Sequence, residues 1–270
     1  MLESSRDMTE RLAAWTVTPT GPGFSTASSE LRPGTHRGVP VMLKIARVDE
    51  EVRGAALLQW WAGHGAAPVL AREGAATLML RATGPRDLAA MAASGQDPAA
   101  TEVLVRTALD LHDRPAPAAS DGVVLIPLRD WFRDLLSSGS HDPLLQRAAA
   151  GAELLLATTR AADVAVLHGD IHHGNVLDFG DRWAAIDPKG LIGHRAFDFA
   201  NILCNPTEAI ASDNLTARLT TISRQANLAP TVLADWAIAW CGLSLAWAAH
   251  APSTSHSRSA RTVAERLIGG

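Results

Sequence analysis

Two short segments of this 270-residue chain carry residue types at spacings that suit phosphoryl transfer. Residues 168–175 are His-Gly-Asp-Ile-His-His-Gly-Asn, and residues 186–189 are Ile-Asp-Pro-Lys. Phosphoryl transfer needs a group that orients the attacking hydroxyl, oxygen ligands for Mg²⁺ and a cation on the nucleotide phosphates. Asp170 is a candidate for the first task, since a carboxylate can accept the hydroxyl proton. Asn175 and Asp187 are candidate Mg²⁺ ligands, because magnesium prefers oxygen donors.

Lys44 is the candidate phosphate-binding cation, near the end of the predicted strand 39–45. Glu51 lies at the start of the helix predicted over residues 50–62, and its carboxylate would hold the Lys44 ammonium toward the α- and β-phosphates. Glu50 is the alternative partner, and an ordinary solvated strand lysine is the alternative to both.

The nucleotide-covering turn is the least specific element. The segment 24–29 offers the hydroxyls of Ser25, Thr26 and Ser28 to phosphates, but it lacks the G-x-G-x-x-G pattern. A plain hairpin therefore stays open as an alternative. The chain also lacks G-x-x-x-x-G-K-[ST], which excludes a P-loop nucleoside triphosphatase.

The histidines of the first segment raise a rival hypothesis, a transition-metal site that includes His168, His172 and His173. The sequence offers no distant Cys/His cluster to complete such a site. We expect His168 to brace the loop by hydrogen bonds instead. We expect Asp198, which opens a helical segment, to bond to the loop backbone.

Composition restricts the class of protein. Hydrophobic residues make up 47% of the chain and the net charge is −4, which fits a globular protein and gives no nucleic-acid footprint. The N-terminal residues contain acids and no apolar core, so no signal peptide is predicted. The longest apolar stretch, residues 236–249, is shorter than the roughly 20 residues of a membrane span, so we expect a buried helix. Two cysteines, Cys204 and Cys241, predict buried free thiols and a cytoplasmic protein.

Hydrophobic periodicity places these residues on predicted elements. Strands at 164–167 and 183–186 would deliver the two motif loops to one edge. The first part of the chain is rich in strands and turns, whereas the pattern after residue 85 is mostly helical; the predicted helices are 99–112, 131–136, 144–161, 215–227, 231–249 and 260–268. We predict two lobes, residues 1–84 and 85–270, with the nucleotide in the cleft between them.

Taken together, these motifs resemble the signature of the aminoglycoside phosphotransferases, and within them the branch of streptomycin 6-kinases and hydroxyurea-resistance kinases. The resemblance runs from about residue 24 to 248. It implies an α+β, two-lobed protein-kinase-like fold, with a small antiparallel β-sheet N-lobe carrying one helix and a larger, mostly helical C-lobe. It also implies ATP and Mg²⁺ as cofactors, and 6-O-phosphorylation of streptomycin that confers resistance. Asp170 matches the catalytic position, Asn175 and Asp187 the metal ligands, and Lys44 with Glu51 the phosphate anchor.

The acceptor implied by the resemblance carries guanidinium groups, so acidic residues of the helical lobe should line its pocket. The candidates are Glu208, Asp213 and Asp235. The tryptophans at 236, 240 and 247 have helical spacing and are expected in the core. One departure from the family is Arg81-Ala82, where an acidic hinge residue followed by an aromatic is expected.

The expected partners of the protein are a cationic aminoglycoside and a nucleotide. We expect no nucleic acid and no membrane as partners, and we expect the protein to be a monomer. Alternatives remain: a kinase of the same fold for hydroxyurea, a sugar or an amino alcohol, or a nucleotide-binding protein without catalysis.

Overall fold

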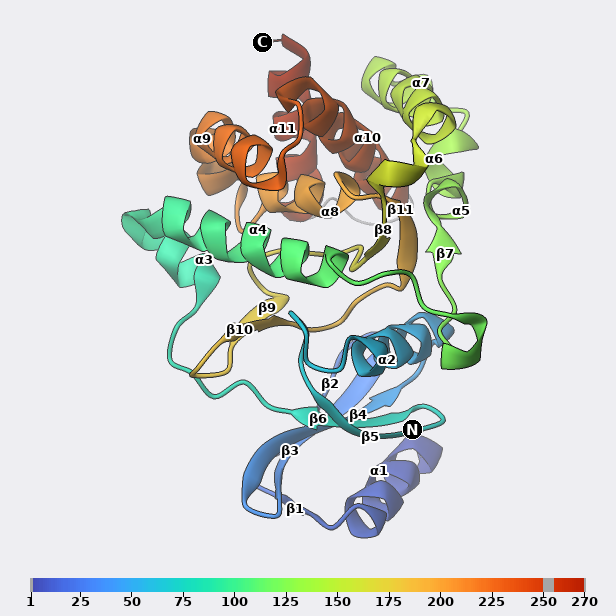
Figure 1. Cartoon of the computed structure of the whole chain (residues 1–270), viewed down its shortest axis with the longest axis vertical. Coiled ribbons are helices and arrows are strands. Elements are labelled where there is room, and N and C mark those ends of the chain that lie inside the picture. Colours follow the sequence, from blue (N-terminus) through green and yellow to red (C-terminus); the bar gives the residue numbers. More distant parts are fainter. Residues whose placement is uncertain (1, 250–254, 270) are drawn as a thin grey trace.

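A computed structural model describes residues 2–249 and 255–269, and the chain folds into two lobes (Figure 1). The smaller lobe contains a sheet and two helices, and the larger one is mostly helical. An extended segment between Leu80 and Leu88 connects them. We propose residue 84, within this segment, as the boundary between the lobes.

The N-lobe sheet is antiparallel, with strand order β1-β3-β4-β6-β5 and β2 paired to β3. Its strands are β1 (Val17–Pro19), β2 (Phe24–Ser25), β3 (Ser29–His36), β4 (Val39–Ala46), β5 (Val69–Glu73) and β6 (Ala76–Leu80). Side chains alternate between the two faces of a strand. On β4 this puts Val41, Leu43 and Ile45 in a small apolar core. Lys44 therefore points to the opposite face, which lines a cavity together with Met42.

The N-lobe has a second helix beside the predicted one, so the expectation of a single helix is wrong. Helix α1 (Leu2–Ala14) packs Met8 and Leu12 against the small core, and Trp15 follows it there. The prediction missed this helix, although Met8, Leu12 and Trp15 recur at helical spacing. Helix α2 (Asp49–Trp61) matches the predicted helix and ends where Ala62 adopts a left-handed conformation with φ 51°.

The C-lobe is built around helix α10, which packs against α7 and α11 (Figure 1). Its helices are α3 (Leu88–Met91), α4 (Asp97–His112), α5 (Leu128–Trp131), α6 (Arg133–Leu136), α7 (Pro143–Thr158), α8 (Phe197–Ala200), α9 (Glu208–Ala226), α10 (Pro230–Ala248) and α11 (Ser255–Gly269). Helix α10 is long and apolar enough to cross a membrane, but 67% of that apolar window is buried inside the protein. The central helix of a globular lobe has the same composition. Cys204 and Cys241 are buried free thiols, as predicted.

Two small sheets of the C-lobe position the motif loops. Strand β8 (Val164–Leu167) pairs antiparallel with β11 (Leu191–His194), and β11 pairs parallel with β7 (Ile126–Pro127). Strand β9 (Val176–Asp178) forms a hairpin with β10 (Trp183–Ala185). Residue 168 follows β8 directly and residue 186 follows β10, and residues of both loops line a cavity together with the strands of the N-lobe.

Candidate active site

The loop after β8 is braced from inside by His168. Its buried ring stacks on Trp61 with centroids 6.4 Å apart. Its Nδ1 accepts from the Asp170 backbone N–H (3.2 Å), and its Nε2 lies 2.8 Å from the Ile186 carbonyl. Nε2 must therefore carry the proton, and burial lowers the pKa of His168, so the ring is neutral. The predicted bracing role is confirmed, and the brace joins the two motif loops.

Asp198 accepts hydrogen bonds from the backbone of the same loop. Its fully buried carboxylate accepts from the N–H groups of His168 (2.9 Å) and Gly169 (2.7 Å). His112 Nε2 lies 2.8 Å from the same carboxylate. Gly169 has φ +86°, and a Cβ there would lie 2.7 Å from a Leu191 methyl carbon. The prediction that Asp198 bonds to the loop backbone is confirmed, and the loop conformation needs a glycine beside it.

Asp170 lies at the end of this loop with 30% of its side chain exposed. Asn175 Nδ2 donates to its carbonyl oxygen (3.0 Å) and to its Oδ2 (3.2 Å). Asn201 Nδ2 donates to Oδ1 at 2.8 Å. Burial raises the pKa of Asp170 to about 6, although the charge of Lys189 opposes the rise. A carboxylate with this pKa is well suited to accept a proton near neutral pH.

Lys44 joins three chain segments. Its Nζ forms ion pairs with Glu51 of α2 and with Asp187 of the second motif loop. Ser28 Oγ donates to the other oxygen of Glu51 at 2.7 Å. Burial raises the pKa of Asp187, but the charge and hydrogen bond of Lys44 outweigh it and lower the pKa to about 2. Glu51 is thus the carboxylate that pairs with Lys44, and Glu50 has another partner.

That other partner is Lys189, which is not among the residues predicted to act at the site. Its Nζ lies 3.2 Å from Glu50 Oε1, 3.7 Å from Asp187 Oδ2 and 3.9 Å from Asp170 Oδ2. The ammonium group therefore sits between the candidate base and a candidate metal ligand. Its position in the Asp-Pro-Lys segment, two residues after Asp187, is the sequence feature that could have indicated a role for it.

A cavity of about 310 Å³ lies between the sheet and the β9–β10 hairpin. Its lining includes six of the predicted residues, namely Thr26, Ser28, Lys44, Glu51, Asn175 and Asp187. The hinge residues Arg81 and Ala82 line it as well. Ser25 does not; its Oγ accepts from Arg47 Nη2 at 3.2 Å. A volume of this size with apolar walls suits a nucleotide base and sugar.

The donor set at one end of this cavity fits a hard cation such as Mg²⁺. Asp187 is ionised at neutral pH, and the two side-chain hydrogen bonds of Asn175 to Asp170 use Nδ2, which leaves Oδ1 outside those contacts. Magnesium in phosphoryl-transfer sites commonly takes one or two protein oxygens and completes its shell with phosphates and water. The residues present therefore suffice for this role.

The three motif histidines do not converge on a transition-metal site. His168 has both ring nitrogens engaged, as described above, and His173 is buried away from the cavities. Within residues 2–249 and 255–269, no group of three His, Cys, Asp or Glu side chains is arranged to hold a metal ion.

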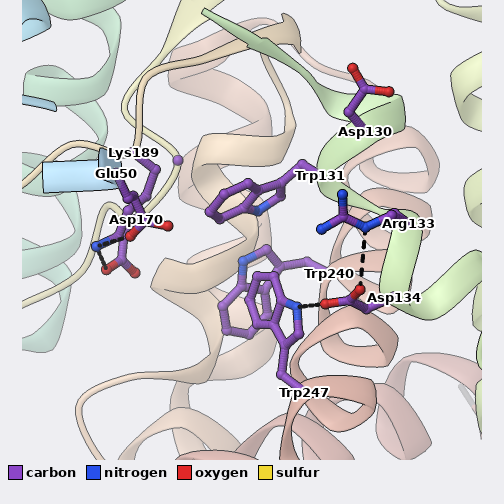
Figure 2. A pocket seen from close by; sticks show the side chains of 10 residues that line it. Glu50, Asp130, Trp131, Arg133, Asp134, Asp170, Lys189, Trp240 and Trp247 are labelled. Carbon is purple, nitrogen blue, oxygen red and sulfur yellow. Dashed lines mark hydrogen bonds and ion pairs between the residues drawn. The ribbon is translucent and has the colours of Figure 1, made fainter. Parts of the chain in front are cut away.

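A second cavity, of about 410 Å³, opens on the other side of Asp170 (Figure 2). Asp170, Lys189 and Glu50 lie on one side of it, and α5 and α6 form the opposite wall with Asp134 and its neighbours. Three indoles lie between the walls; they belong to Trp131, Trp240 and Trp247. Trp247 Nε1 donates to Asp134 at 3.0 Å, and the rings of Trp131 and Trp247 meet edge to face with centroids 5.5 Å apart.

This cavity corrects one expectation. Trp236 and Trp240 are in the core as predicted, and Trp240 also lines the cavity, whereas Trp247 is 39% exposed and contributes to the cavity wall. The three acids expected to line the acceptor pocket do not line this cavity: Glu208 and Asp213 line a shallow surface depression near Arg258, and Asp235 is exposed on α10. The acids of the cavity are Glu50, Asp130, Asp134 and Asp170. Glu50 lies on α2, Asp170 on the loop after β8, and Asp130 and Asp134 on α5 and α6, so only tertiary packing brings the four together. Local spacing indicated Asp170, whereas no local pattern indicated Asp130 and Asp134.

Known proteins resemble this chain throughout its length. The family model for aminoglycoside/hydroxyurea antibiotic resistance kinases matches residues 14–251. A streptomycin 3''-kinase of Klebsiella pneumoniae is 45% identical over 241 residues, covering 86% of this chain and 89% of that protein. A streptomycin 6-kinase of Streptomyces glaucescens is 31% identical over 200 residues, covering 70% of this chain and 63% of that protein.

Solved structures share the fold. The crystal structure of aminoglycoside phosphotransferase APH(4)-Ia aligns with a TM-score of 0.70 at 12% identity, over 100% of this chain and 99% of that one. A thermostable mutant of that enzyme, in a ternary complex with ADP and hygromycin B, aligns with a TM-score of 0.68 at 13% identity, over 97% of each chain. The predicted protein-kinase-like fold is confirmed. The sequence and the fold place this chain in the family of aminoglycoside and hydroxyurea antibiotic resistance kinases.

Proposed function

We propose that this protein transfers the γ-phosphoryl group of ATP, with Mg²⁺, to a hydroxyl of streptomycin. The observation that carries the proposal is the position of Asp170. It lines the second cavity, while the same two motif loops place Asn175 and Asp187 in the first. A nucleotide in one cavity and an acceptor in the other would meet at the Asp170 carboxylate.

Each residue then has a task in the transfer. The oxygen of the acceptor hydroxyl attacks the γ-phosphorus, and Asp170 accepts the proton of that hydroxyl. The bond between the γ-phosphorus and the bridging oxygen breaks, and ADP leaves with that oxygen. Lys44 binds the α- and β-phosphates, and Glu51 and Ser28 hold it in place. Asn175 and Asp187 would hold Mg²⁺, which neutralises charge on the β- and γ-phosphates. Lys189, beside both carboxylates, stabilises the charge of the transferred group.

The second cavity favours a cationic acceptor. Its lining has four carboxylates against two cations, Arg133 and Lys189. Indole faces attract guanidinium and ammonium groups, with energies of about 0.5–2 kcal/mol. Hydroxyurea is small and uncharged and would use little of this surface, so an aminoglycoside is the better candidate.

Which hydroxyl of streptomycin receives the phosphoryl group is a separate question. The motifs pointed to the 6-hydroxyl of streptomycin, yet the 3''-kinase is more similar, at 45% against 31% identity, and is matched over more of its length. We therefore propose the 3''-hydroxyl first and keep the 6-hydroxyl as the second candidate.

A substrate panel tests the proposal. Purified protein is incubated with ATP and Mg²⁺, and ADP release is measured with streptomycin, other aminoglycosides, hydroxyurea and choline. We expect release with streptomycin, and NMR of the product locates the phosphate. Release with hydroxyurea or choline but not with streptomycin refutes the acceptor, and ATP binding without turnover on any acceptor refutes the enzyme.

We further propose that the protein works as a cytoplasmic monomer. The two buried free thiols suit a reducing compartment. Light scattering of the purified protein that gives twice the mass of one chain refutes the monomer.

A further inference from the structure

Two asparagines beyond the motif loops are connected to Asp170 by hydrogen bonds. Asn201 is the first residue of a short 3-10 turn, Asn201–Cys204, directly after α8, and Asn205 follows the turn. Asn201 is 2% exposed and donates through Nδ2 to Asp170 Oδ1 at 2.8 Å. Asn205 Nδ2 donates in turn to Asn201 Oδ1 at 2.7 Å and to the Asn201 carbonyl at 3.1 Å.

The direction of this chain of bonds is fixed by chemistry. A side-chain amide has one oxygen that accepts and one nitrogen that donates. Because Asn205 donates to the Asn201 oxygen, the Asn201 nitrogen must face the carboxylate. Asp170, when ionised, can only accept, so both contacts have the correct polarity.

The turn that carries both asparagines is anchored from behind by a buried ion pair. Arg218 of α9 pairs with Asp97 of α4, and the two residues are 1% and 3% exposed. Arg218 Nη1 also donates to the carbonyls of Ile202 (2.7 Å) and Asn205. Three elements distant in the sequence thus hold the turn in one position.

The Asp170 carboxylate has a competing partner nearby, Lys189, and a rigid turn is needed to keep the two apart. Lys189 Nζ lies 3.9 Å from Asp170 Oδ2, beyond hydrogen-bond distance. A small side-chain rotation would close this gap into a direct ion pair, and the carboxylate would then turn away from the acceptor. The hydrogen bond that Asn201 donates to the other oxygen, Oδ1, resists that rotation.

We propose that Asn201 is a positioning residue for the transfer reaction, oriented by Asn205, and that it keeps the Asp170 carboxylate directed at the acceptor rather than paired with Lys189. This inference rests on the proposed function, because Asp170 is the base there. It adds a requirement for two residues that the motif loops do not contain.

Two variants test the positioning role. Asn201→Leu removes the donor at similar volume. Asn205→Asp replaces a donor with a group that only accepts, so the Asn201 amide must flip and turn its oxygen toward Asp170. We expect kcat to fall about 30-fold or more in each, because orientation dominates such transfers, with KM for both substrates within about threefold of wild type. The matched control is Asn214→Leu on α9, whose Nδ2 donates only to the carbonyl of Ile210 one turn back (2.9 Å), and its kcat should not change.

A double-mutant cycle separates positioning from general damage. In an Asp170→Asn background, adding Asn201→Leu should change kcat by less than about twofold, since the group that it positions has lost its function. A further large loss in the double variant, or an unchanged kcat in both Asn201→Leu and Asn205→Asp, overturns the proposal.

Crystal structures give a readout that does not depend on any acceptor. We expect Asp170 of the Asn201→Leu protein in direct contact with Lys189, and an unmoved carboxylate overturns the inference. If wild type phosphorylates nothing in the panel but Asp170 moves as expected, the proposed function fails while the positioning contact stands. If Asn201→Leu does not fold, Asn205→Asp supplies both measurements.

Discussion

Gly54 offers the sharpest test of how α2 and the second motif loop fit together. It is buried on α2, and a Cβ at this position would lie 2.2 Å from the carbonyl oxygen of Pro188. Real Cβ contacts essentially never come below 3.0 Å, so Gly54→Ala must separate the helix and the loop by about 0.8 Å. Glu51 is one turn earlier on this helix, and Asp187 directly precedes Pro188. The shift therefore falls on the two carboxylates that hold Lys44.

The expected cost follows from that displacement. A misplacement of about 1 Å can cost about 10²-fold in rate, so we expect kcat/KM for ATP to fall by one to two orders of magnitude, roughly. Gly151→Ala on α7 is the matched control, since nothing lies within 4 Å of a Cβ there. A helical Gly→Ala change with open space around the new Cβ should raise the free energy of unfolding by about 1 kcal/mol and leave kinetics unchanged.

Steady-state kinetics and thermal unfolding of both variants decide the matter. If Gly54→Ala keeps wild-type kcat/KM and gains stability as Gly151→Ala does, then the close approach of α2 to Pro188 does not position the site.

Three other variants probe the cavities and the loop. Lys189→Met should lower kcat by about 10²-fold or more, because a cation on the transferred group stabilises the transition state, and Lys189→Arg should restore part of it; unchanged kcat in Lys189→Met contradicts this role. Trp247→Ala should raise KM for streptomycin about tenfold, in line with ~1–2 kcal/mol of cation–π attraction, and leave KM for ATP unchanged; an equal effect on both substrates would indicate a folding defect instead. Asp198→Asn should lower the free energy of unfolding at pH 7 by about 3 kcal/mol, since a charged acceptor of two buried N–H groups is lost. Burial raises the pKa of Asp198, but His112 and the loop amides outweigh this effect and lower the pKa. The stabilisation by the ionised carboxylate is therefore complete above the ordinary carboxyl pKa of about 4. It is lost as the pH falls through the lower pKa of the folded protein. Denaturation curves at pH 7 and below pH 4 should therefore show the gap between wild type and Asp198→Asn shrinking, and a constant gap would contradict the argument.

The motif loops were predictable because their residues are close in the sequence and bounded by clear strands. Spacing alone related Asp170, Asn175 and Asp187, and the strands after which they lie formed as expected. Lys44 and Glu51 were predictable for a similar reason, since a strand and the next helix face each other across a short connection.

The remaining parts depend on packing between distant segments. The acids and indoles of the second cavity come from α2, the loop after β8, α5, α6 and α10, and only the packing of these segments defines the cavity. Asn201 reaches Asp170 through a turn fixed by Arg218, which no periodicity indicates. Helix boundaries depend on local caps as well: α9 begins at Glu208 rather than at the predicted residue 215, because Thr207 caps it through the Ile210 N–H.

The most direct test of the account is the rate of a single turnover from ATP to streptomycin, followed by rapid quenching and mass spectrometry of the antibiotic. Wild-type protein should convert bound streptomycin to a monophosphorylated product, and Asp170→Asn should do so more slowly by about 10²–10⁴-fold with both substrates still bound. Equal rates for the two proteins, or streptomycin that never gains a phosphoryl group, would contradict the account.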